Sequence, residues 1–588
     1  MLKPGVRNIA YGASDFERIR TENRYYVDKT RFIPMLEENY YQFLIRPRRF
    51  GKSLWVSILE TYYDITKKDR FENFFKGLWI GDHPTEERNS YLVLALNFSG
   101  VSSDIREVRT SFEAYCHIRI RGFLYRYRQF FTEQEIQKWN NPALPVATLL
   151  SDLFETCLQR ELPLYLLIDE YDNFANTILS TAGTEAYHDL THGEGFFRNF
   201  FTVLKEGTSH SGSGLKRLFI TGVSPVTMDD VTSGFNIGSN LSLSPSLNAM
   251  VGFTREEVLE MLDYYQREGA FVQDRDETMD IFDEWYDGYQ FAPGQRDSLY
   301  NTDMVVYYMR DCIQTGQPPY ELLDQNIRID YGKLRHLLLV SRQLNGNFDL
   351  LKNIMDTGQA LSPIHTSFPL EHLTIPDNFM SLLYFFGLLT IEAEEMGDFH
   401  LKIPNRTIGL LMYEYLREAW RDVGTFRVEL WKLRSLVRDM AWKGDWEPFF
   451  DFLAGAVAAQ TSIRDYMKGE KVIQGFLLAY LHLNDFLLSH SERELGKGYA
   501  DLFLEPFLLK YPEMSWGYLI ELKYIKRDEL TDTRLEQEIT KAQTQLRQYL
   551  ADDRLKQYPA HVTFTGIILV YHGWELVYRG AVQSMSST

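Results

Sequence analysis

The chain has 588 residues, of which 45% are apolar and 24% are charged, and its formal net charge is −19. These values are ordinary for globular proteins, and the length predicts roughly three or four domains. The net acidity argues against a surface coated for constitutive nucleic-acid binding, although it allows a local basic groove.

The cysteines and the N-terminus indicate the cellular compartment. Cys116, Cys157 and Cys312 lie far apart without metal-site spacing, so they fit neither a disulfide framework nor a zinc site. A reducing cytoplasm is the simplest setting. We find no basic-then-apolar signal pattern and no stretch of the roughly 18 apolar residues that a spanning helix needs. The sequence therefore predicts a cytoplasmic protein with no membrane partner.

A strand, a loop and a helix follow one another near the N-terminus. The apolar run QFLI at 42–45 predicts the strand, the loop reads RPRRFGKS at 46–53, and a helical pattern follows. This order is the context that gives a phosphate-binding loop its meaning. Backbone N–H groups and the helix N-terminus would bind phosphate oxygens. Lys52 would then reach the β- and γ-phosphates, and Ser53 would hold Mg²⁺.

Arg46 departs from the standard phosphate-loop pattern. It stands five residues before Gly51, where that pattern has its first glycine. The first turn of the loop must therefore differ. A chance Gly-Lys-Ser at a helix start is the alternative interpretation. We predict a nucleotide-binding loop formed by Arg46, Gly51, Lys52 and Ser53.

A second apolar run ends in two acidic residues. The sequence LYLLI at 164–168 is followed by Asp169 and Glu170. Continuous apolar runs are typical of fully buried parallel strands. Open α/β sheets bind ligands at the carboxyl ends of such strands. Asp169 would support Mg²⁺ and Glu170 would activate the hydrolytic water, whereas two acids in a surface loop would leave the apolar run unexplained.

Two further apolar runs, at 91–96 and 217–221, predict more strands of the same sheet. The form of the phosphate loop, together with YVDKT at 26–30, resembles the AAA-ATPase-like family. In AAA-type ATPases, a polar residue at the end of one strand senses the γ-phosphate. The resemblance gives that role to Thr221 or Ser224.

The middle of the chain is predicted from caps, turns and short strands. Thr254 begins a capping-box pattern and a helix. The sequence WYDGYQF at 285–291 resembles a family signature, whose aromatic residues could clasp a lid or, more simply, pack a core. A helix at 378–387 followed by strands at 389–391 and 400–403 resembles a winged helix, which binds DNA or serves as a rigid spacer.

The C-terminal part combines acidic residues with a lysine on predicted strands. Asp501 lies in one alternating run, and Glu521 and Lys523 lie in another. Side chains two positions apart on a strand share a face, so a hairpin could bring Asp501 beside the other two. Carboxylate oxygens are the ligands that Mg²⁺ prefers. A nearby ammonium can orient attacking water and offset charge on a phosphate.

The surroundings of these residues predict an α/β domain. An apolar helix is expected over 471–489, leading to Glu494, and an amphipathic helix over 535–549. Strands are expected at 564–571 and 574–578. A Glu-x-Lys pair alone is usually solvated, and an aspartate after glycines is usually turn chemistry. Only the ordered combination indicates a nuclease site.

The motifs RELGKGYAD at 493–501 and ELK at 521–523 resemble the PD-(D/E)XK nuclease superfamily. The resemblance is to the branch whose chains begin with an AAA-ATPase-like domain, although Ala500 replaces the superfamily's proline. It implies that three acids hold Mg²⁺ or Mn²⁺, that a lysine assists and that a glutamine steers water or substrate. These residues are Glu494, Asp501, Glu521, Lys523 and Gln545.

We predict an α/β chain of four regions. They are an N-terminal P-loop (AAA/STAND-like) parallel-sheet domain at 1–253, a helical lid region at 254–365, a winged-helix-like and helical linker region at 366–465 and a C-terminal α/β restriction-endonuclease-like domain at 466–588.

The predicted function is that of a nucleotide-regulated, Mg²⁺-dependent nuclease coupled to an ATPase module. Its cofactors would be ATP and Mg²⁺ or Mn²⁺, and its partner nucleic acid, with DNA favoured over RNA. The resemblance further implies homo-oligomers and a role in genome defence or mobile-element biology. Two alternatives stay open: a nucleotide-switched protein that grips nucleic acid without cleaving it, and a packed scaffold with fossil motifs.

Overall fold

The structure is a computed structural model of the whole chain. It describes residues 5–583 except 183, 194, 210–212, 233–237, 328–338, 341–342, 345, 423–425, 465–466, 468 and 496–497. The chain divides into two compact units, the first formed by residues 1–336 and 359–408, the second by residues 337–358 and 409–588.

A five-stranded parallel sheet forms the centre of the first unit, in the order β2-β3-β4-β1-β5. Its strands are β1 (Tyr41–Ile45), β2 (Leu92–Asn97), β3 (Leu164–Asp169), β4 (Leu215–Gly222) and β5 (Ser239–Asn240). Every residue of β3 is buried, as its continuous apolar run predicts. The predicted N-terminal parallel-sheet domain is therefore confirmed.

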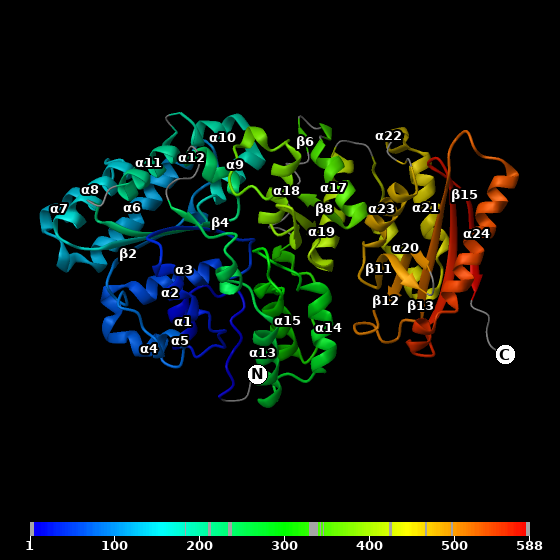
Figure 1. Cartoon of the computed structure of the whole chain (residues 1–588), viewed down its shortest axis with the longest axis horizontal. Helices are drawn as coiled ribbons and strands as arrows, with labels where there is room; N and C mark the ends of the chain where they lie inside the picture. Colours follow the sequence, from blue (N-terminus) through cyan, green and yellow to red (C-terminus); the bar gives the residue numbers. More distant parts are fainter. Residues whose placement is uncertain are drawn as a thin grey trace. The chain divides into compact units, whose positions relative to one another are not determined.

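Helices cover both faces of this sheet. In Figure 1 the cyan helices α6, α8 and α11 lie on one side, and the blue helices α1, α2 and α3 lie on the other. The helices of this part are α1 (Phe16–Thr21), α2 (Ile33–Glu37), α3 (Lys52–Tyr63), α4 (Phe71–Phe75), α5 (Trp79–Asp82), α6 (Val108–Arg126), α7 (Glu133–Trp139), α8 (Val146–Gln159), α9 (Asn173–Ala182), α10 (Thr184–Thr191), α11 (Phe196–Ser209) and α12 (Pro225–Thr232).

Three helices continue the first unit, α13 (Arg255–Arg267), α14 (Arg275–Trp285) and α15 (Thr302–Thr315). The predicted capping box starts α13, because Thr254 Oγ1 accepts from Glu257 N while Glu257 returns a bond to the Thr254 N–H. Gly288 makes the turn after α14 with a φ of +94°. A Cβ there would lie 2.1 Å from Pro404 O, so only glycine fits this position.

The predicted helix and hairpin of the middle region are present, as α18 (Pro376–Phe385), β9 (Thr390–Glu395) and β10 (Asp398–Lys402). Met396 and Gly397 join the two strands, both with positive φ, as tight hairpin turns require. A third strand, β8 (Gln359–Ser362), pairs with β10 and was not predicted.

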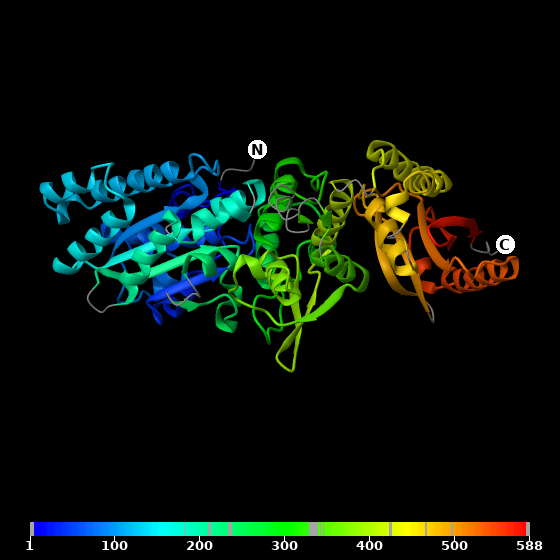
Figure 2. The ribbon, with the colours of Figure 1, turned by 90° about the horizontal axis from the view of Figure 1, so that it is seen from above.

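The second unit contains a mixed five-stranded sheet in the order β11-β12-β13-β14-β15, in which only the β13–β14 pair is parallel. Its strands are β11 (Leu487–Leu495), β12 (Gly498–Pro506), β13 (Trp516–Ile525), β14 (Thr563–His572) and β15 (Glu575–Gln583). Figure 2 shows this sheet between the orange-red helix α24 and the yellow helices α20 and α21.

The remaining elements surround that sheet or precede it in the chain. They are β6 (Leu339–Val340), β7 (Gln343–Leu344), α17 (Gly346–Thr357), α19 (Arg406–Asp422), α20 (Leu430–Lys443), α21 (Glu447–Ala458), α22 (Thr461–Arg464), α23 (Glu470–Leu481) and α24 (Asp532–Leu550). The helix expected over 471–489 is therefore too long: α23 ends at Leu481, just before the polar residues that lead into β11.

The amphipathic pattern of α24 does form the core of the second unit. Ala542, Leu546 and Tyr549 are buried against Phe503, Ile568 and their neighbours on the sheet. Burying such side chains removes apolar area from water, which is the main favourable term in folding. Among the described residues, no helix combines the length and the apolar character that crossing a bilayer requires.

Leu546→Ala should destabilise the second unit by about 2–5 kcal/mol, because it leaves a cavity where Leu546 has no exposed surface. Hydrogen exchange of the β13 and β14 amides in the full chain measures this loss. The matched control is Arg547→Ala, at the next and exposed position of α24. Equal protection of these amides in both variants would contradict the packing described here.

Candidate functional site

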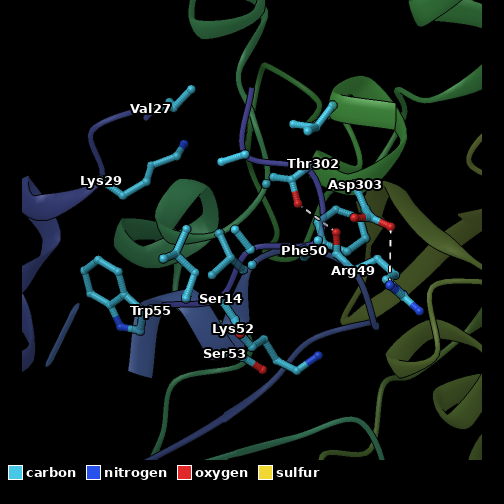
Figure 3. A pocket seen from close by; sticks show the side chains of 18 of the residues that line it. Ser14, Val27, Lys29, Arg49, Phe50, Lys52, Ser53, Trp55, Thr302 and Asp303 are labelled. Atoms are coloured by element: carbon cyan, nitrogen blue, oxygen red, sulfur yellow. Dashed lines mark hydrogen bonds and ion pairs between the residues drawn. The ribbon is translucent and has the colours of Figure 1, made fainter. Parts of the chain in front are cut away.

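A cavity of about 540 Å³ opens beside the first turn of α3 (Figure 3). Residues 48–53 of the phosphate loop line it together with Glu170. Apolar side chains from several segments complete the wall, among them Tyr25, Trp55 and Met261. The volume and the mixed lining are those of a small-molecule site large enough for a mononucleotide.

Lys52 is buried and folds back onto its own loop. Its ammonium donates to the carbonyl oxygens of Arg46, at 2.9 Å, and Pro47, at 2.7 Å. Burial lowers the pKa of Lys52 to about 8, while the nearby charges of Asp169 and Glu170 act in the opposite direction. A phosphate placed on this loop would offer the ammonium anionic acceptors in place of neutral carbonyls.

Ser53 and Asp169 meet at the carboxyl end of β3. The Asp169 carboxylate accepts from Asn97 Nδ2 at 2.9 Å. Burial raises the pKa of Asp169, and the nearby Ser53 hydroxyl partly offsets this shift. Glu170 follows with a φ of +50° and lines the cavity. The hydroxyl and carboxylate that the P-loop hypothesis assigns to Mg²⁺ are thus adjacent.

The side chains of Arg46 and Thr221 donate hydrogen bonds to backbone carbonyls. The Arg46 guanidinium lies 4.6 Å from the centre of the Phe291 ring and donates to Ile45 O and Ser242 O. Burial lowers the pKa of Arg46 to about 10. Thr221 Oγ1 donates to Leu44 O at 2.9 Å, which ties β4 to β1. Neither side chain lines the described cavity, so both support the loop and the sheet from behind.

Asp172, to which the sequence assigned no role, organises the end of β4. Its carboxylate accepts from the backbone N–H groups of Val223 and Ser224, the latter at 2.6 Å. Asp172 is 1% exposed, so its buried oxygens are satisfied by these backbone donors. Ser224, one of the two residues predicted to sense the γ-phosphate beside Thr221, is therefore held by the segment that follows Asp169.

Residues at the start of α15 contact the phosphate loop. Arg49 O accepts from Thr302 Oγ1 at 2.7 Å at the start of α15, and the Arg49 guanidinium lies 3.5 Å from Asp303 (Figure 3). Phe50 meets the rings of Tyr289 and Phe291 edge-on, with centroids 4.8 and 5.0 Å away. The aromatic residues of 285–291 therefore pack a core and also contact the phosphate loop through Phe50, so the two interpretations of this segment are compatible.

The second candidate centre lies where β12 and β13 separate. The ladder between them is paired at Leu502–Ile520. One residue further on, the Asp501 carboxylate accepts from Leu522 N at 2.7 Å, in the place of a backbone acceptor. A side chain that satisfies an otherwise unpaired N–H keeps this edge closed and fixes the carboxylate toward β13.

Glu521 and Lys523 point to the same face of β13, as their spacing predicts. The Lys523 ammonium lies 2.7 Å from Glu521 Oε2 and 3.9 Å from Asp501 Oδ2. Glu521 is 1% exposed and Lys523 is 7% exposed. Burial, and then the charge of Asp501, raises the pKa of Glu521 to about 7, while Lys523 opposes the shift. Burial also raises the pKa of Asp501.

These residues fit a divalent cation. Glu521 Oε1 is buried and makes no hydrogen bond to any described residue. An unsatisfied carboxylate oxygen at a buried position is costly, and a cation would remove that cost. With Asp501 beside it, the cluster offers the hard oxygen donors that Mg²⁺ and Mn²⁺ favour.

Gln545 reaches the cluster through Tyr549. Its Nε2 lies 3.5 Å from the Tyr549 hydroxyl, which donates to Tyr499 O at 3.0 Å. The charges of Glu521 and Asp501 add to burial in raising the pKa of Tyr549. The backbone of Glu494 pairs with Tyr499, but the side chain of Glu494 lies outside the described residues.

Glu470 belongs to this centre, although the sequence analysis missed it. It begins α23, and the charge of Asp501 adds to burial in raising its pKa, whereas Lys523 opposes the shift. Gln474, one turn later, donates to Asp501 O. An acid and an amide at i and i+4 on the helix before the hairpin were the available signal.

Comparison with known proteins supports two domains. Residues 10–232 match the protein family described as predicted AAA-ATPase, and residues 468–579 match the PD-(D/E)XK nuclease superfamily. The chain therefore joins a domain of the first kind to a C-terminal domain of the second, as the motifs predicted.

Individual similar proteins are more distant. The uncharacterized protein in vnfD 5′ region of Azotobacter chroococcum mcd 1 is 25% identical over 323 residues, which are 53% of this chain and 55% of that protein. The chain thus spans about half the length of this relative. The ORC2 protein of Aeropyrum pernix, solved as ADPNP–ADP complexes, has a TM-score of 0.31 at 12% identity, over 69% of this chain and 97% of that one.

In EDTA, Glu521→Gln should stabilise the second unit more at about pH 8 than at about pH 5. Because the pKa of Glu521 is raised to about 7, the stability contributed by its neutral form is greatest at low pH and is lost as the pH rises through about 7. The matched control is Glu536→Gln, on the exposed face of α24. Equal shifts in unfolding temperature at both pH values would contradict the shifted pKa.

Proposed function

We propose that the PD-(D/E)XK domain hydrolyses phosphodiester bonds of nucleic acid, DNA in particular, with Mg²⁺ or Mn²⁺, and that ATP on the N-terminal domain regulates this activity. The observation that carries the proposal is the buried cluster of Asp501, Glu521 and Lys523, whose Glu521 Oε1 has no hydrogen bond among the described residues. A buried carboxylate oxygen without a hydrogen bond is costly, and a bound cation would satisfy it.

Each residue has a distinct part in this mechanism. Asp501 and Glu521 would hold the cation, which supplies Lewis acidity at the scissile phosphate and lowers the pKa of water. Lys523 keeps Glu521 in place at 2.7 Å and offers positive charge to the phosphate. Gln545 and Tyr549 position water or substrate at the edge of the cluster. Glu494 would add a further carboxylate, as the resemblance implies.

Positive charge near the cluster supports a nucleic-acid backbone as substrate. Lys471 and Lys541 are exposed, and both act on the pKa of Glu470 against its rise, which places them beside the centre. Phosphate contacts dominate nucleic-acid affinity and do not depend on the net charge of the whole chain. The net charge of −19 for the whole chain does not exclude such a local concentration of positive charge.

The hairpin of the winged-helix-like region favours the spacer hypothesis. Glu392, Glu394 and Glu395 are exposed on β9. Among the described residues, Glu392 pairs with Lys402 and Glu395 pairs with His400. A row of carboxylates repels phosphates, so this wing is a poor surface for DNA. We therefore propose that nucleic acid binds at the C-terminal domain, and that the wing is a spacer.

Replacing both Glu521 and Lys523 by alanine should lower Mg²⁺-dependent cleavage of plasmid DNA by at least about 100-fold, because metal retention and charge stabilisation are lost together. Gel electrophoresis of the products measures the rate. Lys526→Ala, an exposed lysine just beyond β13, is the matched control. Cleavage at the wild-type rate by the double variant would refute the proposed centre, and DNA binding without any cleavage by the wild type would favour the non-cleaving alternative.

Lys52→Ala should weaken ATP binding by at least about tenfold, since a charge-assisted bond to the phosphates is worth about 1.5–3 kcal/mol. Anisotropy of a fluorescent ATP analogue measures the affinity. The control is Lys68→Ala, which removes an exposed lysine outside the phosphate loop. The same variant should abolish any effect of ATP on cleavage. Unchanged affinity in Lys52→Ala would support the scaffold hypothesis for the N-terminal domain.

A further inference from the structure

Two histidines and a glutamate gather in the first unit, away from the residues of both sites described above. His188 lies on α10 and His192 directly follows that helix, while Glu371 lies on the short helix η7 (Leu370–His372). Their nearest nitrogen and oxygen atoms all lie within 4.8 Å of one another. The side chains are 31%, 36% and 47% exposed, so the cluster lies near the surface.

The geometry is that of metal ligands. His188 Nε2 lies 3.0 Å from Glu371 Oε1, and His192 Nε2 lies 3.9 Å from the same oxygen. The two rings stack in parallel, with centroids 4.4 Å apart and an angle of 8° between their planes. Ligands of a tetrahedral zinc ion lie about 3.3–3.5 Å from one another, given bonds of about 2.0–2.1 Å, so small side-chain movements would complete the site.

The hydrogen bonds of Thr191 fix which nitrogen of His192 carries the lone pair. Thr191 Oγ1 donates its single proton to Tyr187 O at 3.0 Å. It must therefore accept from His192 Nδ1, at 2.9 Å. In the neutral ring, this leaves the Nε2 lone pair directed toward Glu371. A metal-binding histidine characteristically donates its other N–H in this way.

Asp230 supplies a second carboxylate. Its side chain is 0% exposed, and its Oδ1 lies 3.8 Å from His192 Nε2. The other oxygen accepts from the Tyr187 hydroxyl at 2.7 Å. Two carboxylates balance the charge of a divalent ion, whereas two protonated imidazoles stacked at 4.4 Å would repel each other.

His188 argues for a metal over a simple ion pair. Its Nε2 is buried and close to Glu371, yet it makes no hydrogen bond to any described residue. A proton shared between the two atoms would need a more linear arrangement. A cation between them needs only their lone pairs.

We infer that His188, His192 and Glu371, with the charge of Asp230 beside them, bind one divalent transition-metal ion, Zn²⁺ by ligand type. The ion links α10 to η7, which comes directly before α18 of the winged-helix-like region. The buried cysteines are not required, because imidazole and carboxylate ligands suffice.

Zinc measured by mass spectrometry in the purified full chain tests this site. We expect about one Zn²⁺ per chain, retained when Glu521→Ala removes the nuclease cluster and lost when His188 and His192 are both replaced by glutamine. His372→Gln removes an exposed imidazole of η7 outside the cluster and should keep the zinc. Zinc absent from the wild type after incubation with Zn²⁺, or retained by the double variant, would overturn the site.

Glu371→Gln keeps the inference testable if the double variant fails to fold, because this side chain is 47% exposed. It should weaken Zn²⁺ affinity by at least about tenfold in a competition titration with a chelating dye. Co²⁺ in the wild type should give the visible absorption of a tetrahedral site, with lower intensity in Glu371→Gln. Equal affinity and equal spectra would assign the cluster to ion pairing alone and overturn the metal site.

Discussion

The Glu521–Lys523 pair lies on the central strand of the C-terminal sheet, and the surrounding architecture keeps these two charges together out of water. Removing either charge from solvent costs several kcal/mol, which only close pairing and further hydrogen bonds can offset. β14 pairs along the whole of β13 on one side, and Asp501 closes the gap on the other. The apolar stripe of α24 then seals the sheet.

A comparison with Arg217 shows why the C-terminal pair indicates chemistry. Arg217 is also buried, at 2% exposure, but it pairs with Glu87 and donates to several backbone carbonyls. It is a satisfied structural cation that fastens β4 to the C-terminal end of α2 and the residues just after it. Glu521, in contrast, keeps one buried oxygen without a hydrogen bond among the described residues. An incomplete buried network persists where a ligand completes it.

The N-terminal domain also contains a buried charged group that a ligand would satisfy, and there the ligand would be a phosphate. Lys52 donates to two carbonyl oxygens of its own loop, and burial lowers its pKa to about 8. The loop itself is held from outside by Thr302 and by the aromatic contacts of Phe50. Any movement of the phosphate loop would therefore act on α15 and on the aromatic residues after the turn at Gly288, which is a physical route for the proposed regulation by nucleotide.

Much of the fold could be predicted from local patterns. The apolar run before Asp169 specified a buried parallel strand, and the capping box at Thr254 specified a helix start. The helix before β11 was predicted too long, because an apolar run has the same composition in a buried helix and in a buried strand. The structure divides the chain into two compact units, and the bounds of the four predicted regions stay a prediction.

The sequence by itself determined those features of the sites that lie within one element or one loop. The Gly-Lys-Ser turn, the acids after β3 and the Glu-x-Lys spacing on β13 are of this kind, since backbone periodicity alone sets which side chains share a face. Only the tertiary structure decided that Gln474 contacts Asp501, that Arg46 turns toward Phe291, and that His188 lies beside Glu371. Those pairs come from segments distant in the chain, and their proximity follows from packing, which no local pattern encodes.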